Sequence, residues 1–214
     1  MSVGCRLGIV LGGLLAAGAL HATEVAVCTD RGRAVIELAD DAAPLQVANF
    51  LGYVDSGFYS GTVFHRAISG FVVQGGGVDR QLRPRATREP VANESRDGIS
   101  NTRGTVAAAR LGDDPDSATA QFFVNLADNV QLDADRDLGF TVFGRVREGI
   151  EIFDEVSRLP TEAAGPFRAD VPMPLIAIKS IARLDEAALA AFPADGREAA
   201  LKVAIAAATD DPPE

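Results

Sequence analysis

The chain has 214 residues, 47% of them hydrophobic, and a formal net charge of −10. This length is enough for one ordinary domain with a sizeable apolar core and further segments outside it. The acidity argues against nucleic acid as a partner, because a surface that binds phosphates needs a basic patch.

Residues 1–22 are expected to lie outside that domain. Arg6 is their only charge, residues 7–20 form an apolar run, and small residues lead to Ala22. This order is typical of a secretory signal peptide. The run is shorter than the roughly 20 residues of a membrane-spanning helix, although an uncleaved anchor is the alternative. We expect cleavage after Ala22, a net charge that changes from −10 to −11, and a periplasmic or secreted protein without stable membrane insertion.

The cysteine count bears on how an exported chain holds its fold. Cleavage would remove Cys5 and leave Cys28 alone, so no intramolecular disulfide is expected. Cys28 falls in an apolar, strand-like run, where a buried cysteine behaves as a small hydrophobe.

The predicted elements begin with a hairpin. Residues 24–29 and 33–38 are rich in apolar and β-branched residues, and a short Asp-Arg-Gly turn joins them. Residues 44–54 have helical spacing, with Pro44 suited to the first turn and Gly57 to the end. Further strands are predicted at 62–66, 71–74, 104–109, 122–126, 140–146 and 175–184, and a second helix at 149–159, ended by Pro160.

Many short strands with two helices indicate a mainly β domain over residues 23–184, built as a closed antiparallel barrel or a sandwich. Residues 185–214 form a predicted alanine-rich, acidic extension. Its segment 197–208 is amphipathic enough to dock on the domain or on a partner, and a solvated tail is the alternative.

Two blocks of sequence carry the strongest functional signal. Residues 63–79, VFHRAISGFVVQGGGVD, interrupt an apolar pattern with Arg66 and Gln74 and then with three glycines. NTRGTVAAAR at 101–110 is followed by AQFFVN at 120–125. Together the blocks resemble the cyclophilin family of peptidyl-prolyl cis-trans isomerases, most closely its bacterial periplasmic members. The resemblance implies an eight-stranded antiparallel barrel capped by two helices, with the site on its outer face, and proline-containing unfolded or partly folded polypeptides as partners.

The implied reaction needs no cofactor or metal. Rotation about an X–Pro bond faces a barrier of about 18–20 kcal/mol from partial double-bond character, and no covalent bond is made or broken. The enzyme must bind the twisted amide better than the planar one. Arg66 is the expected donor to the prolyl nitrogen. One charge-assisted hydrogen bond contributes about 1.5–3 kcal/mol, whereas a 10⁶-fold acceleration needs about 8 kcal/mol, so an apolar pocket and substrate positioning must supply the rest.

The resemblance also assigns the other site residues. Phe71 and Phe123 are expected to receive the proline ring, although on pattern alone they would be core aromatics. Gln74 and Gln121 are expected to hold the substrate backbone and to orient the arginine. The predicted catalytic residues are Arg66, Gln74 and Phe71, and the predicted substrate-binding residues are Val72, Ala109, Arg110, Gln121, Phe123, Leu132 and Phe140, with Ala109 and Arg110 on a strand that pairs with substrate through its main chain.

The chain departs from the family pattern at four positions. Ser69 replaces a proline, Val72 a methionine, and Phe140 a pocket histidine that is tyrosine in bacterial relatives. Gln131 stands where many eukaryotic members have tryptophan, a main cyclosporin contact, so weak cyclosporin binding is expected. These departures leave room for a second function, a proline-binding chaperone or scaffold with little catalysis. A third possibility is an interaction protein that binds its partner through residues 185–214.

Other motifs are weaker. His65 would be the only histidine of the cleaved chain, so a transition-metal site lacks ligands, and a structural role is expected, with general catalysis the alternative. Residues 75–77 lack the lysine of a phosphate loop and are expected to permit a tight bend. Residues 133–137 are similar to a calcium loop without its glycine and closing glutamate. Ser117 with His65 leaves a hydrolytic set open, but no nucleophile elbow surrounds it.

Overall fold

The computed structural model describes residues 22–96, 98–134 and 138–184. The predicted signal peptide, except Ala22, and the predicted extension at 185–214 lie outside the described residues. In chain order the elements are β1 (Glu24–Thr29), β2 (Gly32–Leu38), α1 (Pro44–Asp55), β3 (Thr62–Ile68), β4 (Val72–Asp79), β5 (Thr105–Ala108), β6 (Phe122–Asn125), the short 3-10 helix η1 (Val130–Leu132), β7 (Val142–Glu148), α2 (Ile150–Ser157), β8 (Thr161–Ala164), β9 (Phe167–Pro172) and β10 (Ile176–Arg183).

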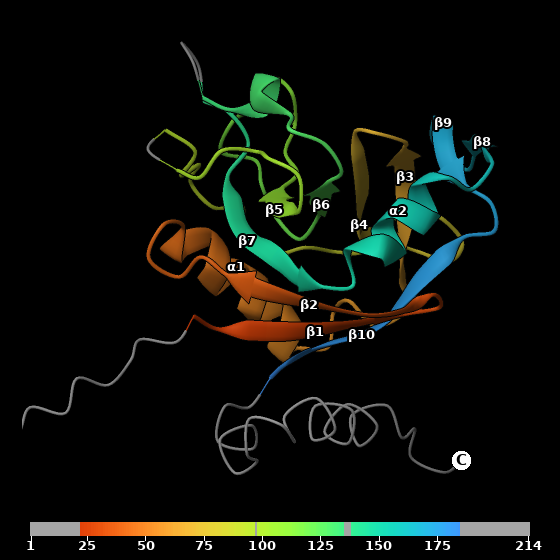
Figure 1. Ribbon diagram of the computed structural model, residues 1–214, viewed down its shortest axis with the longest axis horizontal. Helices are drawn as coiled ribbons and strands as arrows, with labels where there is room; N and C mark the ends of the chain where they lie inside the picture. The colour runs from red at the N-terminus through yellow and green to blue at the C-terminus, as the bar shows by residue number, and fades with distance from the viewer. Residues whose placement is uncertain (1–21, 97, 135–137, 185–214) are drawn as a thin grey trace, which may run out of the picture.

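Eight of the described strands close into one barrel in the order β1-β10-β3-β4-β6-β5-β7-β2 (Figure 1). Every neighbouring pair is antiparallel. The last strand, β10, pairs with both β1 and β3, so the two ends of the domain meet in the barrel wall. The prediction of an antiparallel barrel with eight strands and two helices is confirmed, and the sandwich alternative is wrong.

Helix α1 begins and ends where the sequence predicted. Pro44 occupies its first turn, where a missing N–H costs nothing. The next two N–H groups, of Leu45 and Gln46, donate to the Glu94 carboxylate at 3.1 and 2.9 Å. Gly57, at φ +67°, donates its N–H to the Val54 carbonyl and turns the chain away. The acidic partner at the helix start also suits the positive end of the helix dipole.

The two helices cover opposite ends of the barrel (Figure 1). Helix α2 follows Gly149, whose φ of +81° is easily reached only by glycine. It is shorter than the predicted 149–159. Both helices contribute buried side chains to the same apolar cluster as the barrel interior, including Phe50 of α1 and Phe153 of α2. The core is therefore continuous from one helix through the barrel to the other.

Aromatic rings fill this interior. Phe122 on β6 meets Phe50 edge to face at 5.9 Å and 86°, and Phe64 at 6.4 Å and 89°. Edge-to-face contacts of this kind add to the free energy of apolar burial. Tyr59 is buried among them, but its hydroxyl donates to the Ala120 carbonyl at 2.8 Å. Burial raises the pKa of Tyr59 well above its usual value. Cys28 is free and buried in β1, in the place expected for a small hydrophobe.

The glycines at 75–77 lie inside strand β4, and the expected bend is a local irregularity of that strand, with φ +82° at Gly76 and a shift in the pairing with β3 from Phe64–Gly75 to Thr62–Asp79. They are needed for close packing. A Cβ on Gly75 would lie 2.7 Å from Phe64, and a Cβ on Gly76 would lie 2.9 Å from both Phe122 and Tyr59. The glycines thus let large rings of the interior approach the strand backbone directly.

The sequence reading missed a second, smaller sheet. Strands β8 and β9 form a two-stranded hairpin outside the barrel, between α2 and β10. Half of their side chains are exposed, and the two strands lack the apolar alternation that marks a strand. The end of β9 is buried, where Val171 packs against Val63 of β3 and Ala177 of β10.

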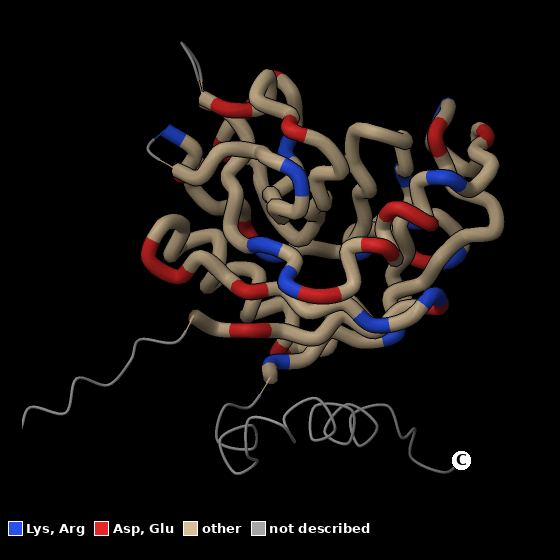
Figure 2. The backbone as a smooth tube through the Cα atoms, in the orientation of Figure 1, with Lys and Arg blue, Asp and Glu red and all other residues tan. Residues whose placement is uncertain are grey.

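Basic and acidic residues are interspersed over the described surface (Figure 2). Exposed ion pairs join several of them, such as Arg183 with Asp55 and Arg103 with Asp154. No helix within residues 22–96, 98–134 and 138–184 is long and apolar enough to cross a membrane.

Candidate active site

A β-bulge on strand β3 turns Arg66 toward the outer face of the barrel. Phe64 pairs with Gly75 and Arg66 with Gln74, so two steps along β3 match one step along β4 and His65 is the extra residue. Phe64 and Ala67 both belong to the interior cluster, although their odd spacing would place them on opposite faces of a regular strand. The bulge resolves this and lets His65 and Arg66 both leave the interior.

Arg66, Gln74 and Gln121 lie next to one another across strand β4. Gln74 faces Arg66 on one side and Phe123 on the other. The Gln74 amide donates to the Gln121 side-chain oxygen at 3.0 Å. Within the described residues neither amide is hydrogen-bonded to Arg66, so the expectation that these glutamines orient the arginine stays a prediction. The Arg66 side chain is 41% exposed, and its Nε lies 3.8 Å from a carboxylate oxygen of Asp170.

The predicted apolar residues form one cluster on the outer face, separate from the interior. Phe123 alternates with the interior residue Phe122 along β6, so the two rings point to opposite sides of the barrel wall. Phe123 and Phe140 pack edge to face at 5.5 Å and 77°. We call this set the outer cluster: Val72, Ala107, Phe123 and Val142, buried, with Phe71, Ala109, Leu132 and Phe140 packed against them and partly buried.

Ala109 and Arg110 lie beyond the end of β5, not on the strand as predicted. The Ala109 N–H still donates to the Gln121 carbonyl at 2.9 Å. The Arg110 side chain, in contrast, has a defined place over the Phe140 ring, 4.6 Å from its centroid. It donates to the carbonyls of Gly139 and Leu138 at 3.1 and 2.8 Å. The identity of residue 110 therefore matters to the outer cluster as well as its main chain, more than the sequence suggested.

Three buried asparagines hold the loops around the outer cluster, and the sequence reading missed them. The Asn129 amide donates to the Phe71 carbonyl at 3.0 Å and to Asn125 at 2.8 Å. The Asn125 amide donates to Asn101 at 3.1 Å, and the Asn101 amide to the Phe140 carbonyl at 3.2 Å. This chain of amides links the two aromatic residues at opposite sides of the cluster. Asn101 and Asn125 belong to the two sequence blocks of the family resemblance, but nothing in the sequence indicated that their amides bond to each other.

Asp133 anchors the same loops. Its carboxylate accepts a hydrogen bond from the Ser100 hydroxyl. It also accepts one from the Asn101 backbone N–H at 2.7 Å and one from the Asn101 side-chain amide at 2.9 Å. Burial alone would raise the pKa of Asp133, but these hydrogen bonds outweigh it and lower the pKa below its usual value. The described residues contain no group of three or more acidic, histidine or cysteine side chains placed to hold a metal ion.

His65 lies on the barrel wall beside Arg66 and is 3% exposed. Its ring stacks on Phe167 of β9 at 4.8 Å and 29°, and its Nδ1 has no hydrogen-bond partner among the described residues. Burial lowers the pKa of His65 to about 4. The imidazole is thus neutral near pH 7. Ser117 is engaged elsewhere, in a local turn with Asp114 and Leu111, which argues against a hydrolytic pair with His65.

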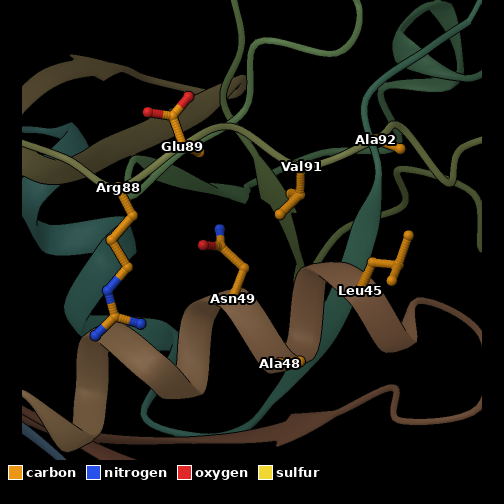
Figure 3. A pocket seen from close by; sticks show the side chains of 7 residues that line it. All are labelled: Leu45, Ala48, Asn49, Arg88, Glu89, Val91 and Ala92. Carbon is orange, nitrogen blue, oxygen red and sulfur yellow. The ribbon is translucent and has the colours of Figure 1, made fainter.

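An open groove lies apart from this outer face, between α1 and the segment 88–92 (Figure 3). None of the predicted site residues lines it. Its walls are formed by Leu45, Ala48, Asn49, Arg88, Glu89, Val91 and Ala92.

Comparison with known proteins identifies the family of the chain. A model of the cyclophilin-type peptidyl-prolyl cis-trans isomerase family matches residues 24–182. The chain belongs to this family. It is a cyclophilin-type peptidyl-prolyl cis-trans isomerase, and its barrel is similar to those of solved cyclophilins.

Relatives of this cyclophilin occur in several bacteria. It is 47% identical over 163 residues to peptidyl-prolyl cis-trans isomerase A of Dickeya dadantii, covering 76% of this chain and 85% of that protein. It is 46% identical over 178 residues to a peptidyl-prolyl cis-trans isomerase of Acinetobacter baylyi, covering 82% and 94%. A solved cyclophilin of Cryptosporidium parvum has 25% sequence identity and a TM-score of 0.64, and the match covers 77% of this chain and 99% of that one. The same protein was also solved in the presence of the dipeptide Ala-Pro, and that structure has a TM-score of 0.62.

The residues that depart from the cyclophilin pattern surround the outer cluster without disrupting it. Ser69 is exposed in the turn before Gly70. Gln131 is exposed on η1, and its amide reaches only Asn129, at 3.5 Å. Val72 and Phe140 are members of the cluster itself. These four departures therefore leave the outer cluster packed as one unit.

Proposed function

We propose that this cyclophilin accelerates rotation about X–Pro bonds in exported polypeptides by non-covalent stabilisation of the twisted amide. The observation that carries this mechanism is the position of Arg66. The bulge holds a partly exposed guanidinium at the outer face, one strand away from the apolar cluster that is expected to receive a proline ring. As the C–N bond twists, the prolyl nitrogen gains a lone pair, and a fixed N–H donor stabilises that state alone.

The outer cluster supplies a second part of the effect. The planar amide is more charge-separated than the twisted amide, so it loses more on transfer from water to an apolar site. Phe71, Leu132 and Phe140 are the partly buried members that a substrate proline can contact, above the buried Val72 and Phe123. Gln74 and Gln121, joined through their amides, lie between Arg66 and this cluster and are placed to bond the substrate backbone.

No proton transfer enters this mechanism. Arginine stays charged throughout the neutral range, and the low pKa of His65, about 4, keeps its imidazole neutral there. We therefore expect the rate to be nearly flat between about pH 6 and pH 8. A bell-shaped profile centred near neutrality would contradict the mechanism.

The proposed substrates are proline-containing segments of unfolded or partly folded exported proteins. Export rests on the signal-like pattern of residues 1–22. An N-terminus at Thr23 in protein recovered from the periplasm or medium is the expected finding, and an intact N-terminus on membrane-bound protein would contradict it. Weak cyclosporin binding is proposed from Gln131, and substitution of Gln131 by Trp should then strengthen inhibition.

The deciding experiment follows cis–trans exchange of a short Ala-Pro peptide by NMR. An Ala-Pro dipeptide accompanied the solved relative, which makes it a suitable probe. We expect fast exchange with the full chain and loss of at least 100-fold in kcat/KM with Arg66→Ala, about 3 kcal/mol of transition-state stabilisation. Arg183→Ala, which removes an exposed arginine of the same charge on β10, is the matched control and should keep its rate.

Full activity in Arg66→Ala would refute the proposed mechanism. Peptide binding without any acceleration by the unaltered chain would instead favour the proline-binding chaperone that the sequence left open.

A further inference from the structure

The β8–β9 hairpin is fixed against the outside of strand β3, on the side of Arg66 (Figure 1). Two anchors of β9 hold it there. Phe167 stacks on the buried His65, and Val171 is fully buried against Val63. Because both anchors contact residues on β3, the part of β9 between them has a defined position relative to that strand.

Asp170 lies between these anchors. Its backbone has φ +65°, in the left-handed region that aspartate and asparagine reach more easily than most residues. Its carboxylate oxygen Oδ2 lies 3.8 Å from Arg66 Nε. The contact is made at Nε, so the two terminal nitrogens of the guanidinium stay available for a substrate. Within the described part of the chain, neither has a hydrogen-bond partner.

No other described residue holds the Arg66 guanidinium by a hydrogen bond or an ion pair. Gln74 faces it across the strand pair, but the Gln74 amide donates to Gln121. A long arginine side chain without a partner samples several rotamers, and only some of them direct an N–H group at the prolyl nitrogen. A carboxylate at a fixed position beside Nε favours a subset of those rotamers.

We propose that Asp170 is a positioning residue for isomerisation, which acts by holding the Arg66 guanidinium toward the outer cluster. The inference rests on the proposed role of Arg66. The hairpin is then part of the catalytic apparatus, although it lies outside the barrel and contributes no group to the substrate. The side chains of Arg66 and Asp170 are 41% and 39% exposed, so the ion pair has only a modest effect on the rate.

Asp170→Asn tests this, because asparagine keeps the size and the tolerance of positive φ and removes only the charge. We expect kcat/KM for the Ala-Pro peptide to fall about three- to fivefold, through kcat, with an unchanged melting temperature. Asp170→Glu should recover part of the loss. The matched control is Asp55→Asn, which removes the carboxylate of an exposed ion pair with Arg183 and should leave the rate unchanged.

A double-mutant cycle separates positioning from a general effect of the hairpin. In an Arg66→Ala chain, which has no side-chain cation for Asp170 to hold, Asp170→Asn should cause no further loss. The same loss in both backgrounds, or no loss in either, would overturn the inference and leave the role of Arg66 standing. Full activity in Arg66→Ala would instead remove the proposed mechanism itself, so the two failures are distinguishable.

Discussion

The barrel wall has an apolar cluster on each side, and the two are built differently. Phe122 and Phe123 are neighbours on β6, yet one points into the interior and the other into the outer cluster. The interior is closed by two helices and packed with aromatic rings. The outer cluster is bordered by loops that a chain of asparagine amides holds in place. Residues of the same type thus pack the interior on one side of a strand and, in the proposed function, bind substrate on the other.

The largest expected effect is on the interior side. Phe122→Ala removes a ring that is 1% exposed and contacts three other rings, so we expect a loss of about 3–5 kcal/mol in the free energy of unfolding. Phe123→Ala should destabilise the fold less, because its cluster opens to solvent on one side, but should lower kcat/KM at least about tenfold. Urea unfolding and peptide exchange measure both quantities.

Conservative variants keep this comparison testable if an alanine variant does not fold. Phe122→Leu should lower stability while the folded fraction keeps its specific activity. Phe123→Leu should lower the specific activity of the folded fraction and change stability little. Equal losses of specific activity in both variants would show that the two sides of the wall are not functionally distinct.

A second contrast concerns the hairpin side of the barrel and predicts a dependence on pH. His65 has a folded pKa of about 4, below its ordinary value of 6.5, because burial disfavours the charged ring. At pH values between about 4 and 6.5, His65 therefore binds a proton in the unfolded chain but not in the folded chain. The free energy of unfolding therefore falls as pH falls from about 6.5 toward 4, by about 3 kcal/mol in all.

The variant His65→Phe can keep the stack on Phe167 and does not titrate, so its stability should be flat over that range. The chain with His65 and the His65→Phe variant should both carry His21→Gln, so that His65 is the only histidine that can titrate in this comparison. Asp154 and Asp133 have lowered pKa values, so their contribution to the free energy of unfolding is lost only when the pH falls to about the ordinary value of 3.8 and below. An unchanged slope between pH 6.5 and 4.5 in His65→Phe would assign the effect to other groups.

The sequence pattern was sufficient for the barrel strands and the two helices because their signals are local, and the family resemblance specified a barrel instead of a sandwich. Alternating apolar residues marked the barrel strands, and Pro44, Gly57 and Pro160 marked the helix ends. The family resemblance supplied the cluster of site residues. The features that the sequence did not predict depend on contacts between distant segments. The bulge at His65 requires knowing that Phe64 and Ala67 share a face, and the role of Asp170 requires a hairpin whose exposed strands carry little apolar pattern.

The smallest expected effect lies at the edge of the outer cluster, where an arginine covers an aromatic ring. Arg110 stacks over Phe140 and bonds the carbonyls of residues 138 and 139. Lysine cannot make these forked contacts, so Arg110→Lys should lower the free energy of unfolding by about 0.5–1 kcal/mol. It should also lower kcat/KM two- to threefold, about 0.5 kcal/mol, because Phe140 becomes less well held.

Arg85 offers the matched control for this change. It lies over the Phe58 ring at 5.9 Å and donates to the Phe58 carbonyl, but it contacts no member of the outer cluster. Arg85→Lys should therefore cost a similar amount of stability and leave kcat/KM unchanged. If both variants lose activity alike, the outer cluster responds to general loosening of the fold. If only Arg110→Lys does, the outer cluster depends on its own border contacts, independently of the stability of the barrel beneath it.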